Sequence, residues 1–320
     1  MKSFFILVLT FCLVLSFVSC SVSDNKQNDN TCYIKFTDSI GKEIKLTSKP
    51  KKVAVLFSSF AEMWKDAGGD IAVTVGDSIE RGFASDDTVI VDSGSGHTTI
   101  NTELLIASNV DFIIGTADYS VQADVCNFMN SIGIPSALFK VDSFDDYLKV
   151  FKIFTDICDT PSNYDLLGTG IKQRIDGMIN IAESSRKAFE KDMLFIRAGG
   201  SARSTKAKKA DDHFACAMLE ELGMQNIAES VPVLYDGLSL EEIIKCNPEY
   251  IFISVMGDEV ATRNYIGSLF QKDGWNGLRA VKENKIIFLP KDLFHYKPNS
   301  KWADAYEYLI NIIICPESDK

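Results

Sequence analysis

The sequence lacks the common catalytic signatures. It has no G-x-x-x-x-G-K-[ST] phosphate loop, no G-x-G-x-x-G, no H-E-x-x-H and no G-x-S-x-G. The stretch "SGSGHTT" at 93–99 has the composition of a serine elbow but not its spacing. We therefore expect a protein that is not an enzyme.

Positive charge is also scarce. There are 33 Lys and Arg against 44 Asp and Glu, which gives a net charge of -11 over 320 residues. Binding to a phosphate backbone needs a concentrated basic face, so we exclude nucleic acid as a partner. With 46% hydrophobic and 24% charged residues, the composition is that of a globular protein of one large or two ordinary domains.

The first twenty residues, "MKSFFILVLTFCLVLSFVSC", differ from the rest. A basic start and an apolar run that ends in small residues describe a secretory signal. The run is short for a membrane anchor and has no basic stop-transfer flank. Its end, "FVSC", resembles the lipobox of bacterial lipoproteins. We therefore expect a lipoprotein signal peptide at 1–20, lipidation of Cys20 and a flexible polar tether at 21–32.

No C-x-x-C pair occurs among the eight cysteines, which speaks against a zinc site or a redox motif. An even number left after the signal permits disulfides in an exported protein. Four of these six lie on apolar helical stretches, which favours buried free thiols for most of them. The disulfide state of all six stays open: Cys32, Cys126, Cys158, Cys216, Cys246 and Cys315.

Short apolar runs alternate with helical patterns after the tether. The segment 32–46 alternates as a hairpin around a turn at 39–41. Continuous apolar strands separated by helices indicate parallel sheets covered on both faces, so we expect an α/β fold. Seven strands are predicted, at 53–57, 71–75, 111–115, 135–139, 193–197, 250–254 and 286–290.

A long stretch without a strand signal divides the chain. Helical spacing continues through it, although Gly168, Gly170 and Gly177 weaken the expectation of a regular helix. We expect two similar lobes joined by one helix, with these boundaries: an N-terminal α/β lobe at 33–160, an interlobe helix at 161–191, a C-terminal α/β lobe at 192–315 and a tail at 316–320.

The two halves repeat one another. "INTELLIASNVDFIIGT" at 100–116 aligns without a gap to "LSLEEIIKCNPEYIFIS" at 238–254 and pairs Glu103 with Glu241. Capping and the helix dipole explain in part why a glutamate stands near a helix start. Two in equivalent places on two lobes can also engage a two-fold symmetric partner that carries arginines.

Four segments together resemble a known family over residues 33–315. They are "KPKKVAVLFSSFAEMWKDAGG", the two repeated segments, and "WNGLRAVKENKIIFLP" followed by "FHYKPNSKWADAYEYL". Their order resembles the class III periplasmic binding proteins, the substrate-binding lipoproteins of bacterial ABC importers for ferric siderophores, haem and cobalamin. The first repeat departs from the second in having Val110 where the second has Pro248, which leaves the glutamates untouched.

The resemblance implies a fold and a role. Two α/β lobes with parallel sheets are joined by a single long backbone helix, and ligand binds in the cleft between them. The protein captures a metal chelate, a ferric siderophore or haem, and delivers it to an ABC permease dimer that docks on Glu103 and Glu241. We expect a monomer without a cofactor, lipid-anchored on the outer face of the cytoplasmic membrane or the periplasmic side.

Ligand residues vary with substrate in this family, so cleft candidates are inferred from position alone. Arg197 and Arg203 begin a local basic stretch that faces either an anionic ligand or solvent. The three histidines lie in polar loops where they are either cleft residues or solvated. The candidates are Ser58, Ser59, Arg81, His97, Tyr119, Arg197, Arg203, Met256, His295 and Tyr296.

Two alternatives remain at this stage. The first keeps the binding fold and changes the ligand to cobalamin or to a free transition metal ion. Only in the free-metal case would His97, His213 and His295 be direct ligands, because their spacing is not that of a metal site. The second, more remote alternative is a lipid-anchored hydrolase that uses the cleft.

Overall fold

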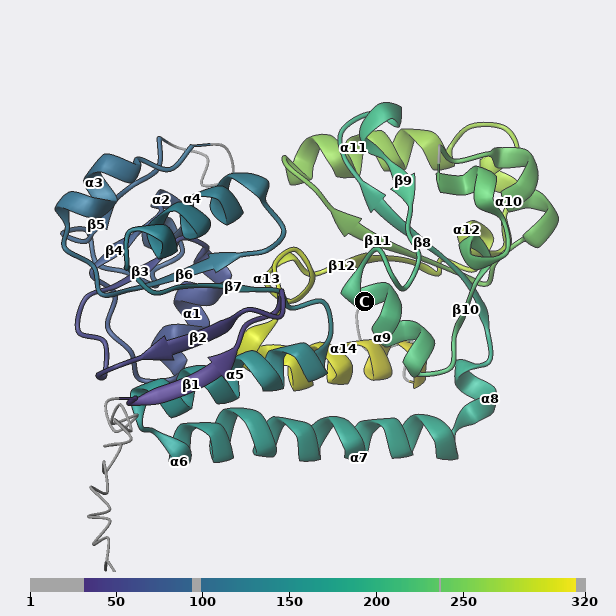
Figure 1. Cartoon of the computed structure of the whole chain (residues 1–320). Helices are drawn as coiled ribbons and strands as arrows, with labels where there is room; N and C mark the ends of the chain where they lie inside the picture. The colour runs from purple at the N-terminus through teal and green to yellow at the C-terminus, as the bar shows by residue number, and fades with distance from the viewer. Residues whose placement is uncertain (1–31, 94–98, 236, 315–320) are drawn as a thin grey trace, which may run out of the picture.

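The computed structural model describes residues 32–93, 99–235 and 237–314. Figure 1 shows two α/β lobes, each with its own sheet, above a long helical segment. The N-terminal sheet has the strand order β5-β4-β3-β6-β7, and all its pairings are parallel. The C-terminal sheet has the order β10-β8-β11-β12, also parallel, with β9 antiparallel to β8. The expected fold class is confirmed.

The seven predicted strands all form. They are β3 (Val53–Val55), β4 (Val73–Thr74), β6 (Phe112–Thr116), β7 (Ser136–Phe139), β8 (Asp192–Ala198), β11 (Tyr250–Val255) and β12 (Ile286–Leu289). The predicted hairpin is the antiparallel pair β1 (Ile34–Thr37) and β2 (Glu43–Leu46). Three strands of two residues were not predicted: β5 (Val89–Ile90), β9 (Lys206–Ala207) and β10 (Gln225–Asn226). β4 is as short, but it lies within the apolar run 71–75 that predicted it.

Helices cover both sheets. The N-terminal lobe has α1 (Ser58–Asp66), α2 (Gly76–Glu80), α3 (Thr102–Ala107), α4 (Ser120–Ser131) and α5 (Phe144–Cys158). The C-terminal half has α9 (Phe214–Glu221), α10 (Leu240–Cys246), α11 (Glu259–Phe270), α12 (Arg279–Lys282), α13 (Lys291–Phe294) and α14 (Trp302–Ile314).

The segment between the lobes is helical but not uniform. It consists of α6 (Pro161–Tyr164), the π-helical turn η1 (Asp165–Thr169), α7 (Gly170–Ser184) and, after a break, α8 (Arg186–Phe189). Gly168 lies in the π-helical turn, where a Cβ would meet the ring of Tyr164 at 3.0 Å. The glycine therefore permits the wider turn that the sequence pattern could not specify.

The repeated sequence folds the same way twice. In α3 and α10 the glutamate is exposed and lies in the first turn. An asparagine in the left-handed region follows each helix: Asn247 (φ 45°) caps α10, and Asn109 (φ 51°) comes directly after the C-cap of α3. Asparagine tolerates this conformation better than most residues, so it suits the turn into the next strand. Leu105 and its equivalent Ile243 are fully buried.

One apolar core runs through both lobes. Alternate residues of each central strand point to opposite faces of its sheet. Phe112 of β6 and its repeat equivalent Tyr250 of β11 belong to the same hydrophobic cluster, whereas Ile113 and its equivalent Ile251 belong to separate clusters, one in each lobe. The shared cluster also takes in buried residues of α5, α7, α9 and α14.

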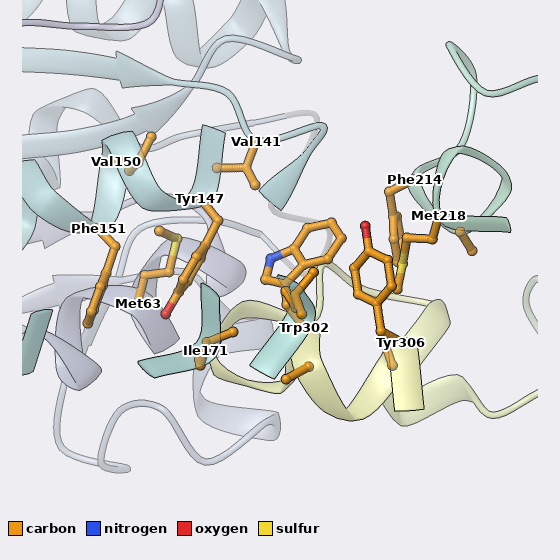
Figure 2. Packing of buried hydrophobic residues seen from close by; sticks show 14 of the residues in the cluster. Met63, Val141, Tyr147, Val150, Phe151, Ile171, Phe214, Met218, Trp302 and Tyr306 are labelled. Atoms are coloured by element: carbon orange, nitrogen blue, oxygen red, sulfur yellow. The ribbon is translucent and has the colours of Figure 1, made fainter. Parts of the chain in front are cut away.

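Trp302, the first residue of α14, lies in the middle of this shared core. Figure 2 shows its indole between Tyr147 and Tyr306. Its ring centroid is 6.0 Å from that of Phe144 and 5.5 Å from that of Phe214, so it contacts both halves of the chain. The side chain is 1% exposed, and its Nε1 has no hydrogen-bond partner in the described parts of the chain.

The chain also crosses back from the C-terminal lobe to the N-terminal lobe. After α13 it reaches the 3₁₀ turn η6 (Asn299–Lys301), and α14 then runs along α7 (Figure 1). The buried Asn299 side chain donates through Nδ2 to the Ser59 carbonyl at 2.9 Å and to Glu62 Oε2 at 2.7 Å. Arg174 of α7 bonds Asp304 of α14 at 2.9 Å. The returning segment therefore adds contacts between the lobes to the connection made by the helical segment 161–189.

We predict that Trp302→Ala lowers the free energy of unfolding by about 3–5 kcal/mol, because it opens a cavity where both lobes meet. Trp302→Phe should cost less, roughly 1–2 kcal/mol, since it keeps a ring and removes an unsatisfied N–H. Urea denaturation followed by circular dichroism measures both. Leu166→Ala, at a side chain that is 69% exposed, is the control and should change stability by less than ~0.5 kcal/mol. Equal stability of Trp302→Ala and wild type would contradict a shared core.

Candidate ligand-binding cleft

A cavity of ≈ 550 Å³ lies between the lobes. This volume is in the range of pockets that enclose a small organic ligand. Its walls come mainly from the residues that follow the parallel strands, the usual place for ligands in α/β sheets. The N-terminal lobe contributes Phe57, Ser58, Ser59, Asp77, Asp118, Tyr119 and Asp142. The C-terminal half contributes Arg197, the segment 210–214, Met256, His295, Tyr296 and Lys297.

The structure brings together seven of the ten ligand candidates. Arg81 lies behind the cavity wall, Arg203 is exposed on the 3₁₀ turn η2 (Ala202–Ser204), and His97 falls outside the described residues. The seven that line the cavity are Ser58, Ser59, Tyr119, Arg197, Met256, His295 and Tyr296. His213, considered only as a metal ligand, also lines it.

Arg81 supports the cavity wall from behind. Its Nη1 donates to Ser58 Oγ at 2.8 Å, and Ser58 in turn donates to Asp77. The guanidinium lies 3.6 Å from Glu62 Oε2 and 3.9 Å from the ring centroid of Tyr296. The charge of Arg81 is therefore already engaged, and its contacts hold Ser58 and Tyr296 in the wall.

His213 is held in a fixed tautomer. Its Nδ1 accepts a hydrogen bond from the Ala215 N–H at 3.2 Å, where it caps the start of α9. The other nitrogen, Nε2, lies 3.2 Å from Ser254 Oγ and donates to it in the neutral ring. Burial, together with nearby positive charges of which Arg197 is the largest contributor, lowers the His213 pKa to about 3. This imidazole is therefore neutral at physiological pH.

His295 and Tyr296 belong to the segment that crosses between the lobes. His295 Nδ1 lies 3.0 Å from the Val255 carbonyl in the C-terminal lobe and donates to it. Lys297 bonds Asp142 Oδ1 at 3.0 Å on the other side of the cavity. Burial lowers the pKa of His295, which also favours a neutral ring. The segment lines the cavity and has contacts to both lobes.

Sequence reasoning did not find the acidic part of this wall. The aspartates that line the cavity each follow a strand or precede a helix, which is the same positional signal that identified the other candidates. They were not predicted as site residues because acidic residues are abundant throughout this protein. They are Asp77, Asp118, Asp142, Asp211 and Asp212.

Most of these carboxylates have cationic partners. Asp142 bonds Lys140 at 2.5 Å in addition to Lys297, and Asp211 lies 3.4 Å from Lys209. Asp77 is 4.0 Å from Arg81. The cavity wall therefore carries more carboxylates than cations, since Arg197 and Lys297 are the only described cations that line it, and aromatic side chains from both lobes lie among these charges.

The repeated glutamates lie away from the cavity. Glu103 on α3 and Glu241 on α10 are exposed, and Figure 1 shows these helices on separate lobes, on the side of the molecule away from α7. Glu241 Oε1 is 3.0 Å from Lys245 Nζ, one turn along its helix. Neither carboxylate contributes to the cavity wall.

Other features bear on the expected site chemistry. The structure has no group of three or more His, Cys, Asp or Glu side chains within its described ranges that could hold a metal ion. Five cysteines there are free thiols, three of them buried, and Cys315 lies outside these ranges. No described helix is both long enough and apolar enough to span a bilayer. Cys20 and most of the "SGSGHTT" stretch also lie outside the described residues.

Solved structures with the same architecture come from several bacteria. A possible iron-binding (periplasmic solute-binding) protein of Staphylococcus epidermidis ATCC 12228 has a TM-score of 0.65 at 20% identity, over 83% of this chain and 99% of that chain. An ABC-type Fe³⁺-hydroxamate transport system of Saccharomonospora viridis DSM 43017 has 0.62 at 18%, over 88% and 99%. A periplasmic heme-binding protein of Roseiflexus sp. RS-1 has 0.63 at 14%, over 82% and 97%. At these identities the likeness shows a shared fold.

The sequence comparisons bear on the family of the chain. No protein with a curated description matches it. The family model described as "Periplasmic binding protein" matches residues 53–293, which is most of the chain and includes strands of both sheets and the segment that joins the lobes. The chain therefore belongs to the periplasmic binding protein family.

Proposed function

We propose that this protein captures a ferric chelate, a siderophore or haem, in the cavity between its lobes and delivers it to an ABC permease. The observation that carries the proposal is a cavity of ≈ 550 Å³ built from the strand ends of both lobes in a member of this family. Proteins of like fold are described as an ABC-type Fe³⁺-hydroxamate transport system, a heme-binding protein and a vitamin B12 binding protein. No bond is made or broken in this role, so the protein acts as a carrier and not as an enzyme.

The cavity side chains favour a chelate over a bare metal ion. Both nitrogens of His213 are engaged in hydrogen bonds, and so is Nδ1 of His295. A free ion would have to break these contacts to gain imidazole ligands. Tyr119 and Tyr296 instead offer aromatic surface from two different segments of the cavity wall, which suits a ligand with an organic shell.

A thermal-shift series with the purified protein tests the ligand class. We expect at least one ferric chelate or haem to raise the melting temperature, because a ligand present at 100 times its dissociation constant stabilises the native state by about 2.7 kcal/mol. Ferric and zinc salts without a chelator are the matched controls and should give no shift. A shift with cyanocobalamin alone would move the proposal to that ligand, and a shift with the bare ions alone would refute it.

We propose further that Glu103 and Glu241 dock on paired basic sites of the permease. Their helices begin at aligned residues of the repeat and lie on separate lobes, so a two-fold symmetric partner can meet both. Three residues further along each helix, the aligned side chains Ile106 and Ile244 are 40% and 47% exposed, so each carboxylate has an exposed apolar residue on its helix. A charged group beside exposed apolar surface is a common form of protein interface.

Charge reversal tests this docking. We predict that Glu103→Arg or Glu241→Arg reduces uptake of the bound chelate roughly tenfold or more in the source cells, because like charges placed opposite each other cost several kcal/mol. Ligand affinity of the purified variants should not change, since neither side chain lines the cavity. Glu183→Arg, on the exposed side of α7, is the control and should transport normally. Loss of affinity in the two variants would instead assign these glutamates to the cleft or the fold.

We propose that a lipid on Cys20 keeps the protein at the membrane surface outside the cytoplasm. The signal-like residues 1–20 and the polar segment 21–32 support this role. Metabolic labelling with radioactive palmitate should label the wild-type protein and not Cys20→Ser. Equal labelling of the two would refute lipidation at this cysteine.

A further inference from the structure

Arg197 differs from the other cations at the cleft. It lies near the end of β8 and lines the cavity. Lys297 bonds Asp142, and Arg81 is enclosed by Ser58, Glu62 and the ring of Tyr296. Arg197, in contrast, makes no side-chain hydrogen bond or ion pair with any residue that the structure describes. Its guanidinium is the cavity-lining cation left for a ligand.

The charge of Arg197 reaches groups on both sides of the cavity. It contributes to the lowered pKa of His213 and of His295, after the larger effect of burial. It also opposes the rise in the pKa of Tyr119, which burial and Asp118 cause, although Tyr119 belongs to the other lobe. The charge of Arg197 thus acts on three cavity side chains, and burial lowers the pKa of both histidines, which favours neutral rings that do not replace its charge.

We propose, on the basis of the proposed function, that Arg197 binds a carboxylate of the ligand and that the cargo is therefore a chelate with a free carboxylate group. A guanidinium presents two parallel N–H donors to the two oxygens of a carboxylate. Enclosing this charge without an anion would leave it desolvated and unpaired, so a ligand that fills the cavity has to supply one.

The acidic side chains narrow the ligand class further. Asp118 and Asp212 line the cavity, and neither has a cation within salt-bridge distance in the described parts of the chain. They repel a ligand that is anionic over its whole surface and accept hydrogen bonds from hydroxyl or amine groups. The ligand that suits both features has a carboxylate directed to Arg197 and hydrogen-bond donors directed to these aspartates.

A binding experiment with paired variants tests this assignment. The probes are ferric citrate, which carries carboxylates and hydroxyls, ferrioxamine B, which is a trihydroxamate without a free carboxylate, haem and cyanocobalamin. The variants are Arg197→Gln, Arg197→Lys and the control Arg203→Gln, which removes the same charge from an exposed arginine outside the cavity. Calorimetric titration gives affinities, and melting temperatures show that each variant is folded.

We expect a carboxylate-bearing probe to bind the wild-type protein. Arg197→Gln should weaken that binding roughly 10- to 100-fold, the usual effect of losing a charge-assisted hydrogen bond. The affinity of Arg197→Lys should lie between those of the wild type and Arg197→Gln. The affinity of Arg203→Gln should equal that of the wild type. Preferred binding of ferrioxamine B, or unchanged affinity in Arg197→Gln, would overturn the carboxylate assignment and leave the proposed function standing. Preferred binding of cyanocobalamin would overturn the assignment and also move the proposed function to that ligand. If no probe binds the folded wild-type protein, both proposals fail.

Discussion

Trp302 lies where the apolar cores of the two lobes meet, with Phe144 on one side and Phe214 on the other. This contact makes one continuous core of the inner sheet faces and the helices between them. Two lobes joined only by a flexible linker would move freely, whereas a large apolar interface restricts their relative motion. The position of every cavity residue depends on this restriction, since the walls come from both lobes.

The restriction also bears on how the cleft can work. The crossing segment is bonded to the C-terminal lobe through His295 and to the N-terminal lobe through Asn299, so it resists wide opening of the cavity. Arg81 adds to this by contacting Tyr296 of that segment from the N-terminal lobe. Ligand recognition in such a cleft relies on side chains that are already in place, with closure of small amplitude.

The sequence was informative where a local pattern determines structure. Continuous apolar runs predicted seven strands, all of which form, and the gapless repeat predicted the matching helices α3 and α10. It was less informative where structure depends on contacts between distant residues. The contacts around Arg81 come from α1, α2 and Tyr296, and no spacing in the sequence predicts them. The aspartates of the cavity were also not predicted as site residues, because a cleft-lining aspartate cannot be told from an exposed one in the sequence.

The aligned repeat ends where the cavity-lining residues begin. The fold and ligand recognition therefore depend on different residues of each lobe. Helix, asparagine turn and strand are the same in both lobes, with α3 and β6 matching α10 and β11. The strands' next residues occupy equivalent places but differ in kind: Asp118 lines the cavity in one lobe and Met256 in the other. Residues before that point build the shared core and place a glutamate on the surface, so they are constrained by the fold and, in the proposed docking, by the permease. Residues after it line the cavity, so changes there are expected to alter ligand recognition more than the fold.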